Sequence, residues 1–159
     1  MTKVIWLLGP AGAGKSTVGW HVYRALDDAA YVDVDQLGLC HPVPPDDPDN
    51  HAVKAGTLGS LWSARVRGAL VVAGGPDRRA LVPAYTDRLP GADVAFCRLR
   101  ADVDLLSARL LARGWPAHLV ARATAVAAEM DRDDFAGPTV DTGGRAPAEA
   151  ARLVLAGLR

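Results

Sequence analysis

The feature that most constrains the fold of this chain is a glycine-rich segment at residues 9–16, which reads Gly-Pro-Ala-Gly-Ala-Gly-Lys-Ser. The segment fits the pattern G-x-x-x-x-G-K-[ST]. Residues 4–8, which precede it, are all apolar, as is typical of a strand buried on both faces. From Lys15 onward, apolar residues such as Val18 and Val22 recur at helical spacing. The sequence therefore predicts a buried strand, a tight loop and a helix in direct succession.

The residue types of this loop suit a phosphate group that is bound by the backbone. Glycines let backbone N–H groups turn toward an anion, and the helix that starts at Lys15 directs its unpaired N–H groups to the same place. Lys15 is expected to bridge the β- and γ-phosphates, the Ser16 hydroxyl to bind Mg²⁺, and Thr17 to reach the α-phosphate. We therefore expect a purine nucleoside triphosphate to bind, with Mg²⁺, to Gly9, Gly12, Ala13, Gly14, Lys15, Ser16 and Thr17.

Apolar runs alternate with helical patterns along the rest of the chain. Further strands are expected at residues 31–35, 69–73, 94–99 and 139–141, and helices at residues 51–68 and 78–88 and from residues 102, 116 and 147 onward. Strands that are separated by helices form parallel β-α-β units. We therefore expect an α/β fold of three layers, with about five parallel strands and helices on both faces of the sheet.

Apolar spacing also predicts which helical residues face the core. The helix from residue 102 is expected to turn Val103, Leu106 and Leu110 inward. The last helix is expected to bury Leu153, Val154 and Leu158.

Two aspartates, Asp33 and Asp35, close the second predicted strand. Alternate residues of a strand share one face, so both carboxylates are expected to point the same way. At the carboxyl end of a parallel strand that face borders the ligand crevice. One acid would then hold a Mg²⁺-bound water while the other takes the proton of an attacking hydroxyl. The alternative is a pair of solvated acids at a strand end.

The third predicted strand ends in glycine, at Gly74 and Gly75, and not in an acid. Mechanical ATPases and GTPases generally place an acid there to hold Mg²⁺. The glycine pair is instead expected to leave space for a second substrate beside the γ-phosphate.

Two arginines, Arg109 and Arg113, lie four residues apart and so share one face of a helix. Gly114 follows and is a candidate hinge, so we expect a short mobile lid near residues 109–122. One arginine would neutralise a phosphate in transfer and the other would stack on a purine. A solvated basic face is the alternative. Arg122 is a weaker candidate.

The segment at residues 41–54 is where a second substrate would be recognised, but no residue in it identifies that substrate. Its acids would attract a cationic molecule or simply belong to a solvated proline loop. Asn50, His51 and Lys54 would contact the second substrate or begin a helix. A phosphate-bearing substrate would need arginines, for which Arg65 and Arg78 are the candidates.

Charge and hydropathy exclude several classes of function. The 159 residues carry 18 basic and 18 acidic side chains, which shows no bulk attraction for nucleic acid or anionic lipid. No apolar run is long enough to span a bilayer or form a signal peptide. We expect one cytoplasmic domain over residues 1–159, with a small-molecule partner, no nucleic acid and no membrane. The oligomeric state is not predicted.

These motifs together resemble the small P-loop kinases of the nucleoside monophosphate, shikimate and gluconate kinase group. The resemblance rests on residues 9–16, on Asp33-Val34-Asp35, on Gly74-Gly75, on residues 106–110 with Arg113, and on Val140-Asp141-Thr142. The acid pair and the tail also resemble ATPase-like kinases of GC-rich bacteria, some of which are similar to antibiotic phosphotransferases. The lid is much shorter than that of adenylate kinases.

The resemblance implies the three-layer P-loop NTPase fold, ATP as donor, and transfer to a small acceptor. By position, Asp33 would hold the Mg²⁺-bound water, Asp35 would meet the acceptor, Arg109 would lie against adenine and Arg113 would be the lid arginine. The expected activity is an ATP-dependent kinase that acts on a small-molecule hydroxyl, with Lys15, Asp35 and Arg113 as the catalytic residues. A nucleoside monophosphate kinase and a nucleotide-dependent switch or ATPase without an acceptor are the alternatives.

Overall fold

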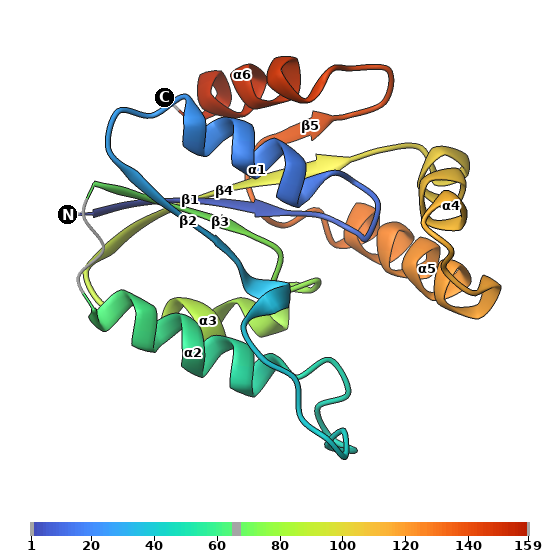
Figure 1. Cartoon of the computed structure of the whole chain (residues 1–159), viewed down its shortest axis with the longest axis horizontal. Coiled ribbons are helices and arrows are strands. Elements are labelled where there is room, and N and C mark those ends of the chain that lie inside the picture. The colour runs from blue at the N-terminus through green and yellow to red at the C-terminus, as the bar shows by residue number, and fades with distance from the viewer. Residues whose placement is uncertain (1, 65–67, 159) are drawn as a thin grey trace.

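The computed structural model describes residues 2–64 and 68–158, and in that part of the chain five parallel strands form one sheet (Figure 1). The strands lie in the order β2-β3-β1-β4-β5, so the first strand is in the middle of the sheet. Their bounds are β1 (Thr2–Leu8), β2 (Ala29–Asp33), β3 (Ala69–Ala73), β4 (Ala92–Arg100) and β5 (Thr139–Asp141). This confirms the predicted α/β class with a five-stranded parallel sheet.

Helices cover both faces of the sheet, as predicted (Figure 1). One face carries α1 (Lys15–Arg24) and α6 (Pro147–Gly157), and the other carries α2 (His51–Ser63) and α3 (Val82–Thr86). The helices α4 (Val103–Ala112) and α5 (Ala117–Asp133) lie beyond the carboxyl ends of the strands. Two short 3₁₀ turns, η1 (Val34–Gln36) and η2 (Arg79–Leu81), complete the described elements.

The central strand β1 divides the core into two halves because its side chains alternate between the two faces. Ile5 and Leu7 belong to the half that packs against α1 and α6, while Trp6 belongs to the half that packs against α2 and α3. Trp6 is fully buried and its indole N–H donates to the carbonyl of Gly74 at 2.8 Å. The sheet therefore holds β1, and the loop that follows it, in a fixed position.

The second strand ends earlier than predicted. It ends at Asp33, and Val34 and Asp35 begin η1. The Asp33 carboxylate accepts a hydrogen bond from the backbone N–H of Asp35 at 3.1 Å, which competes with continued strand pairing. The prediction that Asp33 and Asp35 share a strand face is therefore wrong.

Two predicted core residues are on the surface. Val103 is 45% exposed because it is the first residue of α4, and Leu153 is 42% exposed because α6 turns Val154 inward instead. Leu106 and Leu110 are fully buried, as predicted. Among the described helices, none combines the length and the hydropathy needed to cross a membrane.

Candidate active site

The loop at residues 9–16 connects β1 to α1 and leaves the start of that helix open. Gly14 is the N-cap residue of α1, and no side chain caps the helix or places an acid in its first turn. Gly12 and Gly14 have φ values of 84° and 92°, which favour glycine. The unsatisfied N–H groups of the first turn and the helix dipole therefore favour an anion here. A cavity of about 400 Å³, which we call the loop cavity, lies against this loop.

A hydroxyl and a carboxylate meet beside the loop. Ser16 Oγ donates to Asp33 Oδ2 at 2.5 Å, across the carboxyl ends of β1 and β2. Hard oxygen donors of this kind are the ligands that Mg²⁺ prefers. The pair therefore fits the metal site predicted from the sequence.

Lys15 is partly buried and folds back over the loop, where its Nζ donates to the carbonyl of Pro10 at 3.0 Å. Burial lowers the pKa of Lys15, although the carboxylates of Asp35 and Asp33 oppose this effect and Arg113 adds to it. The carboxylate of Asp77 opposes it as well, so the lysine lies among three acids and one arginine.

Asp35 lies at the carboxyl end of the sheet, next to the glycines that end β3. A Cβ on Gly74 would come within 2.7 Å of Asp35 Oδ2. Lys54 Nζ lies 3.8 Å from Asp35 Oδ1. The absent side chain of Gly74 therefore makes room for the Asp35 carboxylate. That the glycine pair leaves space for a second substrate stays a prediction.

Arg109 ties helix α4 to the glycine loop. Its guanidinium donates to the Gly12 carbonyl at 3.0 Å and to the hydroxyl and carbonyl oxygens of Thr142, each at 3.3 Å. Thr142 is buried and its hydroxyl in turn donates to the Ala13 carbonyl at 3.0 Å. Arg109 and Thr142 line a second cavity of about 360 Å³, the arginine cavity, which also contacts Arg113.

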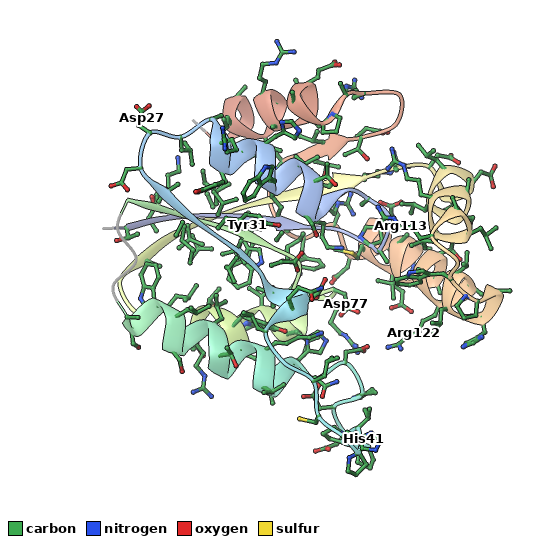
Figure 2. All side chains as sticks on the ribbon, viewed as in Figure 1. Asp27, Tyr31, His41, Asp77, Arg113 and Arg122 are labelled. Atoms are coloured by element: carbon green, nitrogen blue, oxygen red, sulfur yellow. The ribbon has the colours of Figure 1, made fainter. Side chains whose placement is uncertain are left out.

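Arg113 lies beside the loop (Figure 2), and Ala11 of the loop packs against Val120 and Ala123 of α5. Arg113 is the C-cap residue of α4, is exposed, and lines both the arginine cavity and the loop cavity. Its neighbour Trp115 lines the loop cavity as well.

A third cavity of about 290 Å³, which we call the acidic cavity, lies on the other side of Lys15 and Asp35. Asp49, His51 and Asp77 line it. No sequence motif marks Asp77. It follows the Gly-Gly-Pro turn after β3, and the carboxyl ends of parallel strands share one edge, which is the signal that would have found it.

The sequence matches no protein-family model and no curated protein. Solved structures do match it. The tunicamycin resistance protein of Deinococcus radiodurans is 22% identical, with a TM-score of 0.74 over 98% of this chain and 95% of that one. A gluconokinase of Sinorhizobium meliloti 1021 is also 22% identical, with a TM-score of 0.68 over 98% and 91%. The APS kinase of Mycobacterium tuberculosis, solved with AMPPNP and APS, is 24% identical, with a TM-score of 0.62 over 99% and 97%.

The chain has the fold of the small P-loop kinases. This confirms the expected resemblance at the level of the fold. In this P-loop kinase fold, Asp33 and Asp35 both line the loop cavity even though they do not share a strand.

Several residues of the segment at 41–54 have structural partners in this fold. Asp47 caps α2 by accepting from the N–H groups of His51 and Ala52 at 2.8 and 2.9 Å. Asn50 is buried and accepts from the Cys40 N–H at 2.7 Å. Asn50 is therefore no contact for a substrate, whereas Lys54 and His51 do line the acidic cavity.

One arginine named for a phosphate-bearing substrate, Arg78, does not line the acidic cavity. Arg78 is exposed and pairs with Asp77, with its Nε 3.2 Å from Oδ1, and Arg65 lies outside the described residues. Arg122 of α5 does line the cavity, but its NH2 group contacts both carboxylate oxygens of Asp49, at 2.6 and 2.7 Å. Figure 2 shows Arg122 on the helix that faces Asp77.

Proposed function

We propose that this chain is an ATP-dependent kinase that transfers the γ-phosphoryl group to a hydroxyl of a small-molecule acceptor. One observation carries the proposal. Lys15 and Asp35 line both the loop cavity and the acidic cavity. A triphosphate in the first cavity and an acceptor in the second would therefore meet at one cation and one carboxylate, which is the pair that phosphoryl transfer to a hydroxyl requires.

The donor would bind along the loop cavity and the arginine cavity. Backbone N–H groups of Gly12 and Gly14 would hold the phosphates with Lys15 and Ser16, while the N–H of Ala13 donates to the Pro10 carbonyl at 3.2 Å. The arginine cavity, which borders Arg109, would take the adenine. Gly9 and Thr17 complete the loop contacts, as the sequence pattern predicts.

Mg²⁺ would be held by the Ser16 hydroxyl and, through water, by Asp33. When bound, it neutralises charge on the β- and γ-phosphates. The hydrogen bond between these two side chains supports this assignment, because it brings their oxygens together without an intervening residue.

The reaction is a displacement at phosphorus. A bond forms between the acceptor oxygen and the γ-phosphorus, and the bond from that phosphorus to the β,γ-bridging oxygen breaks, so ADP leaves with the electron pair. The acceptor hydroxyl gives its proton to the Asp35 carboxylate. Lys15 and Arg113 stabilise the charge on the transferring group, and we propose that residues 109–122 close over it as a short lid.

The acidic cavity gives less support to a nucleoside monophosphate kinase. Such an enzyme needs an arginine to bind the acceptor phosphate. The arginine that lines this cavity among the described residues, Arg122, is already paired with Asp49. A hydroxyl acceptor therefore agrees better with the site.

The test measures ADP formation by the purified protein with ATP and Mg²⁺, in the presence of pooled hydroxylated metabolites, nucleosides and nucleotides. We expect at least one pool to raise turnover well above the rate without acceptor, and the gain to be lost in Asp35→Asn. If ATP binds tightly and no pool raises turnover, the proposal is contradicted in favour of a nucleotide-dependent switch.

A further inference from the structure

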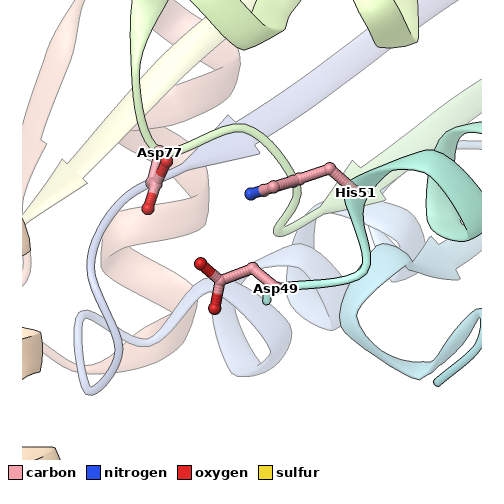
Figure 3. A group of neighbouring side chains, drawn as sticks. All are labelled: Asp49, His51 and Asp77. Atoms are coloured by element: carbon pink, nitrogen blue, oxygen red, sulfur yellow. The ribbon is translucent and has the colours of Figure 1, made fainter. Parts of the chain in front are cut away.

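The acidic cavity has one strongly polar wall. A ring nitrogen of His51 and carboxylate oxygens of Asp49 and Asp77 all lie within 4.8 Å of one another. Figure 3 shows the three side chains pointing toward one another from two segments, the start of α2 and the turn after β3. Three polar groups at this spacing are close enough to contact one small ligand at the same time.

His51 contributes an atom to this wall that lacks a partner. Its Nε2 is buried and has no hydrogen-bond partner among the described residues. Buried polar atoms are rarely left unpaired, because losing water without a replacement hydrogen bond is costly. A ligand in the acidic cavity would supply the missing bond.

The hydrogen bond between His51 and Tyr85 determines whether His51 Nε2 donates to the ligand or accepts from it. His51 Nδ1 lies 2.8 Å from the hydroxyl of Tyr85, which is fully buried. Burial raises the pKa of Tyr85, so its hydroxyl keeps its proton, and His51 Nδ1 is the only hydrogen-bond partner of that hydroxyl among the described residues. Donation to Nδ1 is therefore the arrangement that pairs the buried O–H. We assign the ring hydrogen to Nε2, which then donates to an oxygen of the ligand.

The cations around the cavity are already matched by acids. Arg122 is bound to both oxygens of Asp49, and Lys54 lies 3.8 Å from Asp35. Lys15 lies between the two cavities, where the phosphates of the donor would bind. A carboxylate or phosphate on the acceptor would therefore meet Asp35, Asp49 and Asp77 with no described arginine left to bind it.

Another part of the cavity lining is apolar. Trp115 and Leu119 are about one-third exposed, and with Ala123 and Val126 they line the side formed by α5. An apolar wall with an aromatic ring suits the C–H face of a ring compound, while the polar wall suits its hydroxyls.

We propose that Asp49, His51 and Asp77 form the recognition surface of the acceptor site, and that this surface selects a polyhydroxylated acceptor with no carboxylate or phosphate, such as a sugar, a polyol or a nucleoside. His51 donates to one acceptor oxygen, and the two carboxylates accept from neighbouring hydroxyls. This inference rests on the proposed kinase function. It goes beyond that function because it excludes sugar acids and nucleotides as preferred acceptors.

A divalent cation is the competing occupant of the same three side chains. The guanidinium of Arg122 on Asp49 disfavours it, because a metal would have to share that carboxylate with a fixed positive charge. The experiment therefore includes a metal arm.

The test uses sets of compounds that share one ring and differ in one group: the neutral compound, its amine, its acid and its phosphate. Binding is followed by ligand-detected NMR in the presence of a non-hydrolysable ATP analogue, and transfer is followed with ATP. We expect neutral or amine-bearing members to be preferred at least tenfold over the acid and the phosphate of the same ring. Asp77→Asn and His51→Gln should weaken acceptor binding about tenfold without changing nucleotide affinity, whereas Asp46→Asn, an exposed acid of the same loop, should change neither.

Each contrary result has a distinct meaning. Preferential binding or transfer to the acid or phosphate overturns the inference and leaves the kinase function standing. Binding of neutral members without transfer to any of them supports the recognition surface and contradicts the kinase function. No binding of any class overturns the inference. Tight binding of Mn²⁺ or Zn²⁺ alone, lost in both Asp77→Asn and His51→Gln, also overturns it, because the cluster would then be a metal site.

Discussion

The carboxylate of Asp35 lies over Gly74, so close that a Cβ at position 74 would come within 2.7 Å of Asp35 Oδ2. This contact links the turn after β2 to the end of β3. It also fixes Asp35 between the loop cavity and the acidic cavity. Because Gly74 has no side chain, the carboxylate of Asp35, which is the proposed base, can take this position.

Replacing Gly74 with alanine is expected to displace Asp35 and strain the backbone. Gly74 has a φ of 84°, where a non-glycine residue costs roughly 1–2 kcal/mol. We expect Gly74→Ala to lower kcat at least tenfold and to lower the free energy of unfolding by about 1 kcal/mol or more. Gly56→Ala is the matched control, because Gly56 is helical with no atom within 4 Å of a Cβ, and it should raise stability by up to about 1 kcal/mol. Full activity in Gly74→Ala would contradict the role given to this contact.

Arg109 is predicted to set nucleotide affinity through the shape of its side chain and not only through its charge. Its guanidinium contacts the Gly12 carbonyl and two oxygens of Thr142, and lysine cannot reproduce that fork. Arg109→Lys should raise the Kd for ATP about tenfold, measured by titration calorimetry. Arg152→Lys, an exposed residue on α6, should leave the Kd unchanged. Equal ATP affinity in wild type and Arg109→Lys would contradict the prediction that these Arg109 contacts hold α4 against the loop.

Lys15 is expected to destabilise the unliganded protein, because burial lowers the pKa of its side chain. The unfolded chain then binds this proton more tightly than the folded protein, so the Lys15 contribution to stability rises with pH toward the ordinary lysine value of about 10.4. Lys15→Met should therefore melt at a higher temperature than wild type at pH 7, and this difference should shrink as the pH approaches 10. The same variant should lose ATP binding. A constant difference in melting temperature across this pH range would contradict the prediction.

Arg122 and Asp49 should couple helix α5 to the acceptor side of the site. Because Arg122 is 56% exposed, the pair should contribute no more than about 1 kcal/mol to stability. We expect Arg122→Ala and Asp49→Asn each to raise the acceptor KM. In the double mutant, the rise in KM should be smaller than the two single effects combined. Combining Asp49→Asn with Arg132→Ala, an exposed arginine of the same helix, should give additive effects. Additivity in the first cycle would show that the ion pair does not position the acceptor site.

The fold could be predicted from the sequence because its strongest signals are local. The run at residues 4–8 is apolar without interruption, and the loop after it has a fixed pattern of glycines. The end of β2 could not be predicted in the same way. The backbone N–H of Asp35 donates to the Asp33 carboxylate and starts a turn, and the alternation of apolar residues does not predict that bond.

The donor side of the site was also more predictable than the acceptor side. Residues that bind through the loop and α1 are neighbours in the sequence. Asp49, His51 and Asp77 become neighbours only when the segment before α2 meets the turn after β3. Arg122 likewise meets Asp49 across 73 residues of sequence. Spacing along the chain does not predict such contacts, so the one sequence signal for Asp77 is its place after a strand that ends at the carboxyl edge of the sheet.

The most direct test of the account follows the fate of the γ-phosphorus. Phosphorus-31 NMR of the purified protein with ATP, Mg²⁺ and a pool of neutral hydroxylated compounds would record every phosphorus product at once. We predict a new phosphate-monoester resonance that grows at the rate at which ADP appears and that is absent with Asp35→Asn. Inorganic phosphate as the sole product beside ADP, at the same rate with and without the pool, would contradict it.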